Sequence, residues 1–273
     1  MNKLGKIWRP LTALLFCLAG GCGNEEEAAL TFGQRQTIQA RVRDFFNHAV
    51  LFKPVEGGLD SPLLVRLAPL IIQEITDTNA ANLWRDEFGM PDYSPLVVGQ
   101  TGATTLGSNI HKQFLYSWTY ASSSPPQQTI RTTQGVRLTL DSADAPVIWE
   151  VFADSSRADI IYVSESLEQA ARAEFGPPLP GRKFSVERDL AKTPAVVVAN
   201  VIADGPVAMG PIIFLRSTSR DVTALICRCM PSQFHTLAGQ KDYELDQNST
   251  NNWRGDGFSR TSLDQRLRLP GKF

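Results

Sequence analysis

Short runs of alternating or β-branched residues, separated by turn residues, fill the chain from about residue 95 to residue 237. Residues 113–120 alternate and are rich in aromatic side chains, and residues 136–140 carry valine or leucine at every second position. Strict alternation predicts strands with one buried face. The unbroken apolar run at 195–202 instead predicts a central strand. Residues 211–215 and 223–229 flank a polar stretch and predict a hairpin.

Two other parts of the chain have helical patterns. From about Thr31 apolar residues recur at i, i+4, i+7, i+8 and i+11, which gives one apolar stripe that ends at Lys53-Pro54. The members of this stripe are Ile38, Val42, Phe45, Phe46 and Ala49. Later, Ser166 and Gln169 form a capping box for a helix that runs to Phe175 and ends at Gly176.

These patterns together predict an α+β fold. We expect a mostly antiparallel sheet, an N-terminal helical segment and one helix packed on the sheet. The expected domain spans residues 31–273, with a helical part over about 31–90 and a β-rich part over about 95–237. A polar C-terminal tail is expected over about 238–273.

The first 21 residues are typical of an export leader. Three basic residues precede a short apolar run over residues 11–21. This run is too short to span a bilayer, and it matches the apolar region of a signal peptide. Small residues then precede Cys22. The basic residues are Lys3, Lys6 and Arg9.

Residues 18–22 (LAGGC) resemble the lipobox of bacterial lipoprotein precursors. In that family the cysteine receives acyl chains such as palmitate, and the leader is removed before it. The resemblance implies a signal peptide over 1–21, lipidation of Cys22 and an acidic tether over 22–30. Ala19-x-Gly21 also suits an ordinary signal peptidase, so plain secretion and an uncleaved anchor are the alternatives. Gly23, where inner-membrane lipoproteins of some bacteria carry aspartate, implies the outer membrane or the cell surface.

The composition limits the kinds of partner. The chain has 42% hydrophobic residues, 27 basic and 28 acidic residues, which is typical of a globular protein and not of a disordered one. Three of the basic residues lie in the leader, so the mature surface would be mildly acidic. We therefore expect no nucleic-acid partner, and attachment to the membrane through the acyl chains alone.

Cys227, Cys229 and His235 are the candidate metal ligands, because thiolate and imidazole suit copper or zinc. On a strand, the two cysteines share a face with Cα atoms about 6.6–6.8 Å apart. That separation is at the upper limit of disulfide geometry. Packed thiols, a strained disulfide and a metal or redox site all fit this short motif. No other cofactor is expected.

The sequence contains no Gly-x-Ser-x-Gly elbow and no His-Glu-x-x-His motif. A hydrolase would therefore need His48, His111 or His235 as its base. We expect the acidic residues near strand ends and helix starts to be solvated or to cap helices, rather than to form a catalytic pair. These residues are Glu150, Asp154, Glu165 and Glu168.

Two loop-like motifs are expected to be structural. The glycine-rich stretch 99–108 lacks the lysine of a P-loop and is expected to be a turn between strands. Asp141 and Asp144 lack the spacing of an EF-hand and are expected to lie in a turn. The aromatic residues of the β runs are expected in the core, since exposed ones would instead indicate a sugar-binding or peptide-binding face. They are Trp118, Tyr120, Trp149 and Tyr162.

The leader, together with the lack of a catalytic motif, favours a lipid-anchored cell-envelope protein with a non-catalytic binding or structural role. Its expected partner is a protein or an envelope polymer. A metal-binding or thiol redox protein that uses Cys227 and Cys229 is the second hypothesis. A hydrolase of envelope polymer is the third.

Overall fold

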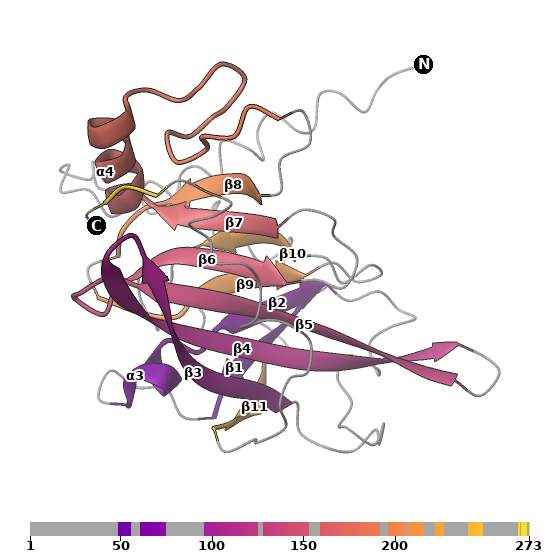
Figure 1. Ribbon diagram of the computed structural model, residues 1–273. Coiled ribbons are helices and arrows are strands. Elements are labelled where there is room, and N and C mark those ends of the chain that lie inside the picture. Colours follow the sequence, from indigo (N-terminus) through magenta and orange to yellow (C-terminus); the bar gives the residue numbers. More distant parts are fainter. Residues whose placement is uncertain are drawn as a thin grey trace, which may run out of the picture.

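The computed structural model describes residues 49–55, 61–74, 96–124, 128–152, 159–191, 196–205, 207–215, 222–226, 240–247, 267, 269–271 and 273. Residues 31–48, which make up most of the helix expected from Thr31, lie outside the described part of the chain. Eleven strands form one sheet in the order β10-β9-β2-β1-β11-β3-β4-β5-β6-β7-β8 (Figure 1). They are β1 (Ala49–Pro54), β2 (Leu70–Glu74), β3 (Leu96–Leu106), β4 (Asn109–Ser124), β5 (Gln128–Leu140), β6 (Pro146–Phe152), β7 (Asp159–Ser164), β8 (Val196–Ile202), β9 (Ile212–Leu215), β10 (Val222–Ile226) and β11 (Gln240–Asp246).

The sheet is mixed, because four of its ten strand pairs are parallel. The parallel pairs are β1 with β11, β3 with β11, β2 with β9, and β7 with β8. The other six pairs are antiparallel, and the longest of them joins β4 to β5. Chain segments far apart in sequence therefore lie side by side in the sheet.

The prediction of a mostly antiparallel α+β fold is wrong. The part of the chain expected to be helical contains strands β1 and β2, and the described helices are only α3 (Leu63–Arg66) and α4 (Glu165–Phe175). Strand β1 carries Val50, Leu51 and Phe52 in succession, all of them buried. A strand covered on both faces has no alternation, so its apolar run could not be distinguished from the end of a helix.

Every strand contributes to one apolar core. The sheet therefore curves around this core, with the interior faces of β1 and β5 directed into the same cluster. We call this cluster the interior core. One member from each strand, in chain order, is Phe52, Ile71, Val97, Tyr116, Leu138, Trp149, Tyr162, Ile202, Ile213, Leu225 and Tyr243.

The α3 turn and the residues that follow it pack into the interior core. The Tyr116 hydroxyl donates a hydrogen bond to the Leu64 carbonyl at 2.6 Å, and the Tyr243 hydroxyl donates one to the Pro69 carbonyl at 2.7 Å. Gly210 lies against the same turn. A Cβ atom at Gly210 would stand 2.3 Å from the carbonyl oxygen of Ala68, so only glycine fits there without movement.

Helix α4 covers the outer face of β7 and β8, where a second apolar cluster lies (Figure 1). The predicted helix is confirmed, but it begins earlier than expected. Ser164 is the N-cap, and its Oγ accepts a hydrogen bond from the Leu167 amide at 3.1 Å. Ser166, the expected cap, instead donates its backbone N–H to the Asp204 carboxylate at 2.9 Å. Gly176 ends the helix with a positive φ of 79°.

The sheet order also revises two other predictions. The run at 195–202 forms β8, which is the terminal strand of the sheet instead of a central one. Its side chains alternate between buried and exposed at the start of the strand. The expected polar tail contains β11, which lies between β1 and β3 and buries Tyr243. The predicted hairpin of β9 and β10 is confirmed.

Both terminal strands carry a register shift. In β8 the pairing with β7 skips Ala199, and in β10 the pairing with β9 skips Thr223. Each shift places one extra residue in the terminal strand, which is the geometry of a β-bulge.

None of the described helices has the length and apolar content needed to cross a membrane.

Candidate functional site

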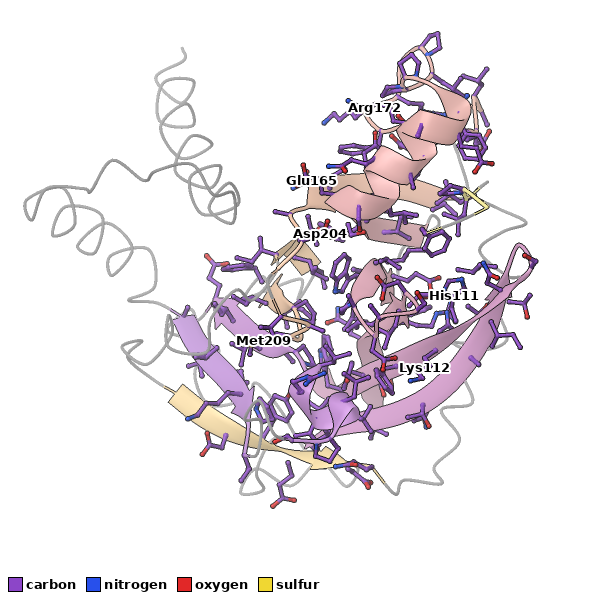
Figure 2. All side chains as sticks on the ribbon, turned by 90° about the vertical axis from the view of Figure 1, so that its left-hand side faces the viewer. His111, Lys112, Glu165, Arg172, Asp204 and Met209 are labelled. Carbon is purple, nitrogen blue, oxygen red and sulfur yellow. The ribbon has the colours of Figure 1, made fainter. Side chains whose placement is uncertain are left out.

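A buried histidine lies near the tip of the β3–β4 hairpin. The two-residue turn Gly107-Ser108 joins these strands, and His111 lies three residues beyond it on β4 (Figure 2). His111 is only 6% exposed. Its Nδ1 atom lies 2.8 Å from the Leu140 carbonyl oxygen. A carbonyl only accepts hydrogen bonds, so Nδ1 carries the proton.

The other ring nitrogen of His111 has no such contact. Within the part of the chain that the structure describes, Nε2 is buried and has no hydrogen-bond partner. In the neutral ring with a protonated Nδ1, Nε2 is an acceptor that can also bind a metal or take up a proton. A buried polar atom without a partner costs about 1–3 kcal/mol. His111 is therefore one of the described residues with a buried polar atom that lacks a hydrogen-bond partner, and Gln73, in which both amide atoms lack one, is another.

Phe273 covers His111, and we call the described residues of this C-terminal segment (267, 269–271 and 273) the strap. Phe273 stacks on the imidazole, with ring centroids 4.8 Å apart and an interplanar angle of 12°. Gly271 donates its backbone N–H to the Glu174 carboxylate of α4 at 2.8 Å. Leu267 is buried in the cluster beneath α4, and Leu269 packs against it. The strap therefore joins the hairpin to the helix, and both views place it between them (Figures 1 and 2).

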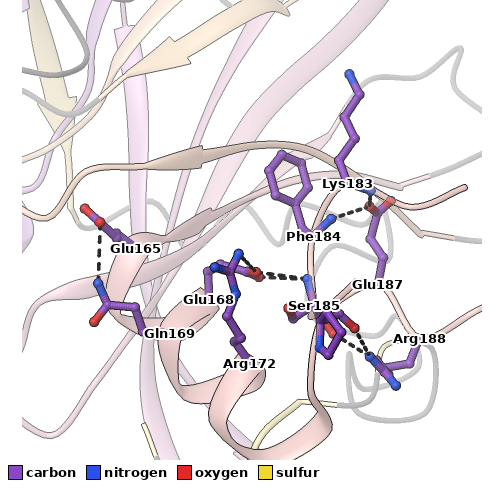
Figure 3. Close-up of polar contacts among 10 residues, drawn as sticks. Glu165, Glu168, Gln169, Arg172, Lys183, Phe184, Ser185, Glu187 and Arg188 are labelled. Carbon is purple, nitrogen blue, oxygen red and sulfur yellow. Dashed lines mark hydrogen bonds and ion pairs between the residues drawn. The ribbon is translucent and has the colours of Figure 1, made fainter. Parts of the chain in front are cut away.

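Buried carboxylates fix the position of α4 and of the loop behind it. Glu168 accepts hydrogen bonds from the Ser185 amide at 3.1 Å and 2.9 Å, one to each carboxylate oxygen (Figure 3). Glu187 accepts hydrogen bonds from the amides of Lys183 and Phe184. Arg172 lies 3.4 Å from Glu168 and is largely exposed. The Glu168 contacts hold the loop against α4, and the Glu187 contacts fold the loop on itself.

A polar row crosses β4, β5 and β6 on the side of the sheet opposite the interior core. Gln113 donates a hydrogen bond to the Thr139 hydroxyl at 2.9 Å. Next to them, Arg137 donates from Nε to Glu150 Oε2 and from Nη2 to Glu150 Oε1, both at 2.6 Å. The guanidinium also lies 5.0 Å from the centre of the Phe152 ring. The sequence did not indicate this pair, because alternation over residues 136–140 predicts exposed side chains on this side of the sheet.

The predicted metal ligands Cys227, Cys229 and His235 lie outside the described residues, as do the lipidation residue Cys22 and the candidate base His48. In the described ranges, no three His, Cys, Asp or Glu side chains form a group that would hold a metal ion. Strand β10 ends at Ile226, so Cys227 directly follows a strand. The metal-site prediction therefore stays untested.

The structure places three of the four acidic candidates. Glu150 is bound to Arg137, Glu168 is bound to the Ser185 amide, and the exposed Glu165 accepts a hydrogen bond from Gln169 at 3.4 Å. Asp154 lies outside the described residues. The expectation was that these residues would be solvated or would cap helices, but Glu150 and Glu168 are buried and bound to other groups.

The turn predicted at Asp141–Asp144 is confirmed. The Asp141 carboxylate accepts hydrogen bonds from the amides of Ala143 and Ala145, and Asp144 forms an ion pair with Lys112 at 2.8 Å. The glycine-rich stretch is mostly strand β3, and only its last two residues, 107 and 108, form a turn.

The structure describes the side chains of three of the four aromatic candidates, and all three are buried, as expected. Trp118, Trp149 and Tyr162 all lie in the interior core. Burial raises the pKa of the Tyr162 hydroxyl, because the charged phenolate would lose its hydration. The side chain of Tyr120 is outside the described part of the chain. These residues therefore belong to the core, and the described ones do not form an exposed binding face.

No protein-family model matches the sequence, and no curated protein matches it either. Some solved structures are weakly similar. One, described as "Toxin fold as basis for microbial attack and plant defense", is 16% identical with a TM-score of 0.22, over 46% of this chain and 55% of that chain. Another, "Toxin fold for microbial attack and plant defense", is 13% identical with a TM-score of 0.27, over 77% and 73%.

A third, "NLPPya in complex with glucosamine", is 18% identical with a TM-score of 0.20, over 40% of this chain and 48% of that chain. The match thus spans about half the length of the first and third of these structures. At such TM-scores we carry no fold, ligand or activity over to this chain.

Proposed function

We propose that the chain is a lipid-anchored protein of the cell envelope with a non-catalytic binding role. The observation that supports this proposal is the leader, in which a basic start and a short apolar run precede Cys22. Several acyl chains on one cysteine would anchor the protein firmly, because each buried methylene adds to membrane affinity. The outer membrane or the cell surface is the proposed location.

The described site favours binding over catalysis. Glu150 and Glu168 are engaged in short hydrogen bonds, so neither is available as an acid or a base. His111 binds a backbone carbonyl through Nδ1, where a catalytic triad would require a carboxylate. These buried polar groups therefore serve the fold.

The anchor is tested by replacing Cys22 with serine in the full chain. The unaltered protein should fractionate with membranes, incorporate labelled palmitate and lose its first 21 residues. The variant should keep its leader or appear in the soluble fraction without label. Cys17→Ser is the matched control, since Cys17 lies within the leader and should be dispensable. An unaltered chain that stays soluble and unlabelled would refute the anchor.

A thiol or metal role for Cys227 and Cys229 is the second proposal, supported by their position directly after β10 and by their spacing. Native and denatured masses of the purified chain, with and without reductant, test it. A metal adduct lost on denaturation, or two hydrogens missing until reduction, would support a chemical site. Two unmodified thiols without an adduct would mark them as packing residues.

A further inference from the structure

Gln73 on β2 is a buried polar residue whose side chain the described fold does not satisfy. It is 0% exposed, and among the residues that the structure describes neither its Nε2 nor its Oε1 atom has a hydrogen-bond partner. Each of these atoms carries the penalty of a polar group that has lost its water without gaining a partner. Gln113, another buried glutamine, differs, because its Nε2 donates a hydrogen bond to the Thr139 hydroxyl at 2.9 Å.

The side chain of Gln73 faces the interior core. Gln73 follows Ile71 by two residues, so the two side chains lie on the same face of β2, and Ile71 belongs to the interior core. The register partners of Gln73 are Val50 on β1 and Leu215 on β9, and both are members of that core. Their side chains are aliphatic and offer no hydrogen bond. The neighbouring strands therefore do not supply the two missing partners.

The interior core contains a second polar atom of this kind but no buried ion pair. Trp149 Nε1 is buried and, in the described ranges, has no hydrogen-bond partner. The carboxylate and guanidinium groups that are buried in the described part of the chain lie elsewhere. Arg137 and Glu150 pair on the other side of the sheet, and Glu168 and Glu187 bind the loop at α4. The polar atoms of the interior core therefore suit a neutral molecule better than an ion, which would need a counter-charge.

We propose that Gln73 binds a small neutral molecule inside the sheet, to which Nε2 donates a hydrogen bond and from which Oε1 accepts one. Water and the hydroxyl group of a small ligand share this chemistry, because each offers a lone pair and an O–H group. The amide presents its donor and its acceptor on one edge, so one such molecule can serve both atoms. This inference goes beyond the proposed envelope role and does not depend on the Cys22 anchor.

Melting temperatures of the full chain in detergent test whether a molecule is bound. Gln73→Met replaces the amide with an apolar group of similar volume. If the molecule is bound, this substitution removes its hydrogen bonds, and the melting temperature should fall by about 2–6 °C. At a dry site the same substitution would remove two unsatisfied polar atoms, and the melting temperature would rise. Gln113→Met is the matched control and should lower the melting temperature in either case, since it breaks the bond to Thr139.

A crystal structure and a native mass of the unaltered chain identify the molecule. Density of one atom within about 2.7–3.2 Å of both Nε2 and Oε1 would support the proposal. An adduct that is lost on denaturation and is missing from Gln73→Met would mark this molecule as a ligand, and density without an adduct would mark it as water.

Two results would overturn the proposal. One is an amide of Gln73 that is surrounded by apolar atoms alone in the crystal structure. The other is a melting temperature of Gln73→Met above that of the unaltered chain. The crystal structure needs no substitution, so it decides the question even if Gln73→Met does not fold.

Discussion

Replacing Glu150 with leucine should destabilise the fold by about 3–5 kcal/mol, the usual cost of leaving one member of a buried ion pair without its partner. Arg137 and Glu150 are 4% and 2% exposed. They share two hydrogen bonds of 2.6 Å. A charge-assisted hydrogen bond contributes about 1.5–3 kcal/mol. Two such bonds give about 3–6 kcal/mol, which agrees with the first figure.

The informative comparison is the double variant Arg137→Met/Glu150→Leu. It removes both charges and keeps the side-chain volumes similar, so its free energy of unfolding should lie within about 1 kcal/mol of the unaltered chain. Urea unfolding of the four chains gives the coupling energy. Two results would refute a buried ion pair that is shielded from water. One is a loss of less than about 1 kcal/mol in the free energy of unfolding for Glu150→Leu. The other is a loss in the double variant equal to the sum of the losses in the two single variants.

Three further substitutions, two of them paired with a control variant, test other parts of the structure. Gly210→Ala should lower the free energy of unfolding by about 1–3 kcal/mol, because its Cβ would overpack against the α3 turn, whereas Gly271→Ala should change it by less than about 0.5 kcal/mol. Equal melting temperatures of the two variants would contradict the close approach of Gly210 to that turn. Burial raises the pKa of Tyr162 in the folded state. The contribution of this shift to the free energy of unfolding should be complete below about pH 10 and be lost as the pH rises through the raised pKa. Tyr162→Phe should therefore reduce the loss of stability at alkaline pH. Glu168→Ala should cost about 1–3 kcal/mol in urea unfolding, and the exposed Glu165→Ala under about 0.5 kcal/mol; a reversed order would show that the loop is not held by the buried carboxylate.

Local signals predicted local elements. Helix α4 has a capping residue, an apolar stripe and a terminal glycine, so its existence followed from the sequence. Its start did not, because both Ser164 and Ser166 are good N-caps. Only the carboxylate of Asp204, 38 residues further along, distinguishes them by binding the Ser166 amide.

The pairing of strands that are far apart in the chain could not be predicted from the sequence. Strand β11 is mostly polar, and among its described side chains only that of Tyr243 is fully buried. It forms a strand because it lies in register between β1 and β3, which are some 190 and 145 residues away. Likewise, no single-chain pattern indicates that Phe273 covers His111. The histidine was a candidate by its chemistry, but its burial and its cover depend on tertiary contacts.

The extra residues Ala199 and Thr223 bear on how copies of this chain behave when they are crowded. A flat terminal strand is a template on which a second sheet can grow, and copies confined to one surface would meet edge to edge often. One inserted residue in each terminal strand twists it and interrupts its row of evenly spaced hydrogen-bonding groups. Strand β8 is thereby divided into two pieces of three residues, 196–198 and 200–202, each too short to seed a cross-β stack.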